Sequence, residues 1–198
     1  MSMGDTKSQQ ALGFLTILEH DQLGYVGGYL ILNSAGRPLE FHCTAPVKPN
    51  RAQQILFGPT LESYLYGEQI GQTLLAKSSV DLLAVCTDVE RALCVRDYVA
   101  TPVALVLAEP AGSDGPSTDA AATSGLATSW RVDSAHGAQP HLHEFTVGRN
   151  RLAVPNHHDD DRQQIAERLT AIISFDLAEP FERIREAIEE AHKGSRAA

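Results

Sequence analysis

The chain has few cysteines and no long apolar run, and both absences limit the cellular compartments in which we expect it to work. Three cysteines in 198 residues, scattered and odd in number, argue against a disulfide framework and favour a reducing environment. No apolar stretch approaches the roughly 18 to 20 residues that a membrane helix needs. The polar start MSMGDTKSQQ also lacks the hydrophobic segment of a secretory signal. We therefore expect a cytoplasmic protein without a membrane partner.

An excess of positive charge is also missing. The formal net charge is -9 at pH 7, from 25 Asp and Glu against 16 Lys and Arg. Proteins that bind nucleic acid need a positive surface to meet the phosphates. We therefore expect no nucleic-acid partner.

Catalytic sequence motifs are absent as well. The chain contains no GxSxG, HExxH, CxxC, EF-hand or P-loop pattern. The leading interpretation is a non-catalytic binding or assembly module, with a protein partner or self-association. The bias toward Arg over Lys and the frequent Ala suggest a bacterial source with a GC-rich genome. The alternative is a small, hydrolase-like enzyme.

The hydrophobic pattern predicts an α/β protein with a mixed sheet, and α+β is the alternative class. Segments 13–19, 25–33 and 39–44 predict an antiparallel meander of three strands. Strand patterns at 80–86 and 103–107 enclose a helix, which is typical of a β-α-β unit with parallel strands. Thr87 and Glu90 have the spacing of a capping box at the start of that helix.

Composition divides the chain into four parts. Residues 1–11 read as a disordered lead and 12–107 as the α/β core domain. Residues 108–129 are small and polar, which predicts a flexible linker or long loop. Residues 130–198 predict a β-hairpin and two helices that pack on the core or on a partner.

His42 is the candidate catalytic residue of the enzyme alternative. It stands beside Cys43 at the end of the third predicted strand, and a thiolate-imidazole pair is a known nucleophile. However, neighbouring residues of a strand face opposite sides of the sheet. We therefore expect Cys43 in the core, with His42 on the other face beside Glu40.

Basic residues around a proline-rich loop suggest a site for a small anionic ligand. Arg37, Lys48 and Arg51 are basic positions in an acidic protein. Asn50 is a suitable N-cap for a helix over 51–57, and a helix amino terminus favours anions. The hypothesis is a phosphate or carboxylate pocket, and the alternative is ordinary surface charge.

Histidines near the predicted hairpin suggest a metal site. A symmetrical hairpin between strands at 145–147 and 152–154 pairs His141 with His158 and brings His143 to the same face. Three imidazoles are a ligand set that zinc accepts. The leading expectation is no cofactor, with the histidines in a solvated loop, and zinc is the alternative.

Two glycines mark a helix predicted over about 59–76. Gly67 and Gly71 lie one turn apart, and Tyr64 and Leu75 extend the same side. Glycine in a helix interior costs stability, so we expect another backbone to cross there. That backbone belongs either to this chain's sheet or to a second copy, and the homodimer is the favoured interpretation.

Overall fold

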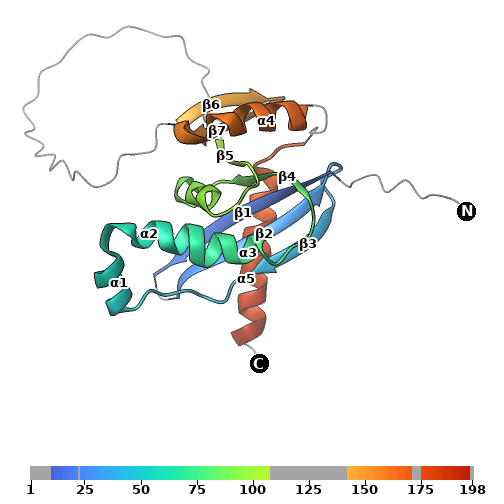
Figure 1. Cartoon of the computed structure of the whole chain (residues 1–198). Helices are drawn as coiled ribbons and strands as arrows, with labels where there is room; N and C mark the ends of the chain where they lie inside the picture. The colour runs from blue at the N-terminus through green and yellow to red at the C-terminus, as the bar shows by residue number, and fades with distance from the viewer. Residues whose placement is uncertain (1–9, 22, 108–141, 171–174, 197–198) are drawn as a thin grey trace, which may run out of the picture.

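The computed structural model describes residues 10–21, 23–107, 142–170 and 175–196, which form one seven-stranded mixed sheet with helices on both faces (Figure 1). The strands lie in the order β3-β2-β1-β4-β5-β7-β6. The predicted α/β class with a mixed sheet is confirmed. The predicted linker 108–129 and most of the predicted lead 1–11 lie outside the described residues, although Ala11 already belongs to the first strand.

The first part of the sheet contains both predicted strand units. The antiparallel meander is confirmed, with strands β1 (Ala11–His20), β2 (Gly24–Asn33) and β3 (Pro38–Cys43). The parallel pair is confirmed as β4 (Leu82–Thr87) and β5 (Val103–Leu107), and β4 also runs parallel to β1.

The second part of the sheet comes from the carboxy-terminal region. A hairpin of β6 (Leu142–Val147) and β7 (Asn150–Pro155) pairs with β5 through β7. The carboxy-terminal part therefore extends the sheet of the core.

Helices cover the two faces of this sheet. One face is covered by α2 (Leu61–Ser63), the π-helix η2 (Tyr64–Gln72), α3 (Thr73–Leu75) and the 3-10 helix η3 (Glu90–Asp97). They are preceded by α1 (Arg51–Phe57) and η1 (Gly58–Thr60), which contain no buried residue. The other face carries α4 (Asp159–Thr170), which follows the short η4 (Asn156–His158), and α5 (Glu179–Arg196). Among the described residues, no helix combines the length and the apolar character needed to cross a membrane.

The alternation of side chains along the strands produces two separate cores. Phe14 points to the α5 side, where its ring meets Phe181 edge-on at 5.7 Å between centroids. On β2, a Cβ atom on Gly27 would lie 2.3 Å from Ile70, and one on Gly28 would lie 2.4 Å from Ile184. These two glycines therefore let a helix approach β2 closely from each side.

The predicted capping box is wrong. Thr87 is the last residue of β4, and Val89 occupies the N-cap position of η3. The Thr87 hydroxyl accepts a hydrogen bond from the Val89 backbone N–H at 3.2 Å, while Glu90 begins the helix. The short turn between strand and helix uses the threonine locally, and the helix is 3-10 rather than α.

The predicted hairpin register is also wrong. The structure pairs Leu142 with Pro155, His143 with Val154 and Val147 with Asn150. The turn has two residues and begins at Gly148, whose φ of 60° suits a tight hairpin turn. Each residue of β6 therefore meets a partner two positions earlier than expected.

Candidate functional site

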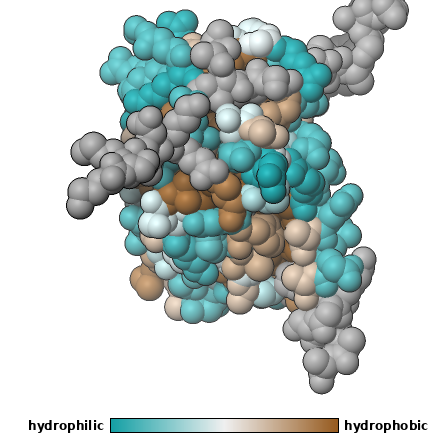
Figure 2. All heavy atoms as spheres, turned by 90° about the vertical axis from the view of Figure 1, so that its right-hand side faces the viewer, coloured by the Kyte–Doolittle hydropathy of each residue, from teal (hydrophilic) through white to brown (hydrophobic). Residues whose placement is uncertain are grey.

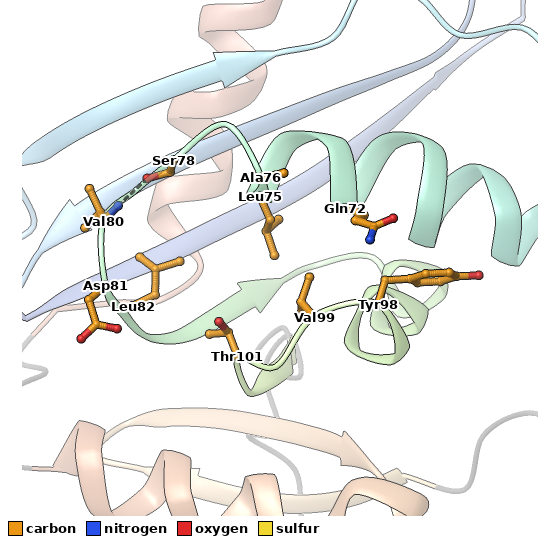
Figure 3. A pocket seen from close by; sticks show the side chains of 10 residues that line it. All are labelled: Gln72, Leu75, Ala76, Ser78, Val80, Asp81, Leu82, Tyr98, Val99 and Thr101. Atoms are coloured by element: carbon orange, nitrogen blue, oxygen red, sulfur yellow. Dashed lines mark hydrogen bonds between the residues drawn. The ribbon is translucent and has the colours of Figure 1, made fainter.

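A cavity of about 310 Å³ opens beside the amino end of β4 (Figure 3). Gln72 and Leu75 line it from the helical side, and Tyr98 and Thr101 line it from the connection between η3 and β5. Among the described residues that line it, Asp81 is the one carboxylate and none is Lys or Arg. The described part of the cavity wall therefore offers no cation to an anionic ligand.

His42 lies on β3 and is paired with a carboxylate. Its Nε2 atom lies 3.0 Å from Glu40 Oε2, and its ring stacks over Tyr29 with 6.5 Å between centroids. Hydrogen bonds from His42 and from the Ser78 hydroxyl lower the pKa of Glu40. Ser78 lines the cavity, so the His42–Glu40 pair adjoins the cavity wall without being part of its lining.

This arrangement does not form a nucleophile with its base. In a nucleophile-base pair, the imidazole must reach the hydroxyl or thiol directly. Here Glu40 stands between His42 and Ser78. Cys43 pairs across from Gly28 on the α5 side of the sheet, whereas His42 stacks over Tyr29, which belongs to the opposite core. The prediction of opposite faces is confirmed, but Cys43 is exposed rather than in the core, because β3 is an edge strand.

The structure separates Arg37 from the other residues of the predicted anion pocket, which lie together at the start of α1. Arg37 follows β2, whereas Lys48 adjoins Val47, which pairs with Tyr25 at the start of β2. A strand of this length spans roughly 30 Å, so Arg37 lies far from Lys48. Arg51 opens α1 and donates to Gln54 at 3.4 Å.

Asn50 caps α1 as predicted. Its side-chain oxygen accepts from the Gln53 backbone N–H at 2.8 Å, and the Gln53 side chain accepts from the Asn50 backbone N–H at 2.9 Å. This reciprocal capping box uses two of the backbone N–H groups at the helix start, those of Asn50 and Gln53, that an anion would otherwise meet. The Asn50 cap therefore has a structural role in the described chain.

The predicted metal ligands are divided between different partners. His141 lies outside the described residues. His143 Nδ1 lies 2.7 Å from Asp159 Oδ1, whereas His158 Nε2 lies 3.1 Å from Asp97 Oδ1. The register found for the hairpin explains this separation, because it pairs His143 with Val154 instead of placing it near His158.

His157 and Asp97 join His158 in a cluster that the sequence prediction missed. Their ligand atoms all lie within 4.8 Å of one another, and this is the one group of three or more potential metal ligands in the described part of the chain. The adjacent histidines are a pattern in the sequence that could have indicated a metal site. No sequence pattern indicates Asp97, because it lies 61 residues from His158 and only the fold brings the two together.

The close approach at Gly67 and Gly71 is found, and the neighbour is η3 of the same chain. A Cβ atom on Gly67 would lie 2.5 Å from the Tyr98 ring, and one on Gly71 would lie 2.6 Å from Val95. Both glycines are buried within the chain. They therefore offer no surface to a second copy. Self-association stays a prediction, and any contact between copies must use other residues.

The other two residues of that predicted interface have separate surroundings. Tyr64 stacks on Phe57 of α1, with 4.1 Å between ring centroids and 22° between planes. Leu75 lines the cavity on the opposite end of the helical segment. The stack on Tyr64 connects α1 to the helices that cover the sheet.

Among the described residues, large apolar side chains are exposed on α1, on β3 and at Leu23 in the turn between β1 and β2. On α1, which contains no buried residue, Ile55 is 65% exposed and Leu56 is 82% exposed. On the edge strand β3, Phe41 is 39% exposed. The face on the right-hand side of Figure 1 shows hydrophobic atoms gathered near its middle with hydrophilic atoms around them (Figure 2).

Comparison with family models, with curated proteins and with solved structures finds no match for this chain.

Proposed function

We propose that this protein is a cytoplasmic, non-catalytic assembly module that associates with a second copy of itself through α1. The observation that carries the proposal is the exposure of Ile55 and Leu56 on a helix with no buried residue. Apolar side chains of this size gain free energy when a contact removes them from water.

The isolation of α1 supports a role in contact. A helix of seven residues is too short to be stable alone in water. Within the chain, α1 has its capping box and the stack of Phe57 on Tyr64, but its other apolar side chains face outward. In Figure 1, α1 lies at one end of the molecule, away from the central strands. A partner on this helix supplies the burial that the chain does not.

The charge of α1 supports a second copy as the partner. Two identical chains of net charge -9 repel each other, so a self-contact must avoid acidic residues. The helix has no acidic residue and one basic residue, Arg51. A twofold axis brings the same patch of both copies together, which is the commonest form of oligomer.

The expected association is weak. Full burial of an Ile or Leu side chain contributes about 1.5 to 3 kcal/mol, and two copies bring four such side chains. Association itself costs roughly 4 to 15 kcal/mol. The most favourable balance of these terms is about 8 kcal/mol, so we expect a dissociation constant no tighter than about 1 µM.

Sedimentation equilibrium over a concentration series from low micromolar to several hundred micromolar tests the proposal. The unmodified chain is expected to shift from monomer to dimer, and Leu56→Lys is expected to remain monomeric. Gln163→Lys is the matched control, because it adds the same charge at an exposed position of α4. It is expected to dimerise like the unmodified chain.

Other results would contradict the proposal. A monomer at the highest concentration rejects self-association. A dimer that Leu56→Lys leaves intact rejects α1 as its surface. If Phe41→Lys alone splits the dimer, the contact uses the β3 edge instead.

A further inference from the structure

A second site lies where the end of η3 meets the short helix η4. Asp97 Oδ1 lies 3.1 Å from His158 Nε2 and 3.8 Å from His157 Nε2. The two imidazole rings are 4.4 Å apart between centroids and are inclined by 50°. We propose that Asp97, His157 and His158 bind one divalent transition-metal ion of the zinc type.

The ligand chemistry fits this class of ion. Two imidazole nitrogens and one carboxylate oxygen form a mixed N/O set that zinc and similar borderline metals accept. In a tetrahedral zinc site with bonds of about 2.0 to 2.2 Å, the ligand atoms lie about 3.3 to 3.6 Å from one another. The distances from Asp97 Oδ1 are on either side of this value. Small rotations of exposed side chains are therefore enough to close the site around an ion.

A buried ion pair holds the two ligand-bearing segments in place. Arg96, next to Asp97, donates to Asp161 through Nε at 2.6 Å and through Nη2 at 3.1 Å. Asp161 is 1% exposed and lies three residues beyond His158. The forked geometry fixes distance and orientation together. The ligands therefore belong to segments whose relative position is set before an ion binds.

The location suggests what the ion does. Asp97 is the last residue of η3, just before the connection to β5, whereas the histidines belong to η4, which leads into α4. An ion held by all three joins the core strands to the carboxy-terminal part through a second contact beside the ion pair. The exposure of Asp97 and His157 leaves one coordination position for water or for a group from outside. This inference is independent of self-association through α1.

Zinc titration of the full, untagged chain after treatment with a chelator tests the inference. Isothermal calorimetry is expected to find one zinc ion per chain, and cobalt is expected to give the visible absorption of a four-coordinate site. Asp97→Asn and His158→Gln are each expected to weaken zinc binding at least tenfold. Zinc is also expected to raise the melting temperature of the unmodified chain by mass action.

His143→Gln is the matched control, because His143 forms a similar exposed pair with Asp159. It is expected to bind zinc as the unmodified chain does. A double variant, His136→Ala with His141→Ala, removes two histidines outside the described residues and is also expected to retain the site. Melting without metal shows whether each variant is folded.

Two results would overturn the inference. One is the absence of zinc binding at micromolar concentrations in the folded, unmodified chain. The other is loss of binding in His143→Gln or in the His136 and His141 double variant while Asp97→Asn binds normally. That pattern assigns the ion to the hairpin histidines instead.

Discussion

Replacement of Asp161 by Asn is expected to destabilise the protein more than any exposed change nearby. The Asp161 carboxylate accepts two hydrogen bonds from Arg96 and a longer one, at 3.4 Å, from the Val103 backbone N–H. The pairing with Asp161 raises the pKa of Arg96, so the cation persists throughout the range in which the protein is handled. Asn removes the negative charge and leaves the cation without its counter-ion.

The magnitude follows from the burial of the two partners. Breaking a buried ion pair by removing one partner costs about 3 to 5 kcal/mol. The Arg96 side chain is 20% exposed and keeps some contact with water, whereas Asp161 is 1% exposed. We therefore expect the lower end, about 3 kcal/mol. For a chain of this size, that corresponds to a fall in melting temperature of roughly 6 to 12 °C.

Urea unfolding in the presence of a chelator measures this cost without interference from metal. Asp160→Asn is the matched control, because it makes the same chemical change at the neighbouring, exposed position. It is expected to stay within about 0.5 kcal/mol of the unmodified chain. The double variant Arg96→Met with Asp161→Leu is expected to recover most of the lost stability, because an apolar pair removes both charges. Equal effects of Asp161→Asn and Asp160→Asn would refute the reasoning.

Two substitutions test the packing of buried residues, and a labelling experiment tests the exposure of two cysteines. Gly71→Leu is expected to lower the free energy of unfolding by about 1 to 3 kcal/mol, because its side chain overlaps η3. Exposed Thr73→Leu serves as the control, and equal melting temperatures would contradict the close contact. Tyr29→Phe is expected to leave the free energy of unfolding unchanged or raise it, since the buried hydroxyl has no hydrogen-bond partner among the described residues; a marked loss would reveal a partner. Exposed Cys43 is expected to react rapidly with a disulfide reagent, whereas burial raises the pKa of Cys86 to about 12 and delays its reaction until unfolding. Rapid labelling that persists in Cys43→Ser would contradict this.

The sequence by itself determined the features that depend on near neighbours. The strands of the meander follow from apolar patterns within ten residues. The capping box of α1 uses Asn50 and Gln53, three positions apart, so its geometry is contained in the local chain. The parallel pairing of β4 and β5 follows from the length of the connection between them.

The tertiary structure decided the contacts between distant segments. Gly67 and Gly71 required a close neighbour, but only the fold shows that this neighbour is η3 and not a second copy. The hairpin register depended on a two-residue turn whose backbone geometry the alternating pattern did not specify. The approach of Asp97 to His158 spans 61 residues and depends on how η3 and α4 meet beside the sheet. Periodicity and spacing describe one segment at a time, so they do not reveal such a cluster.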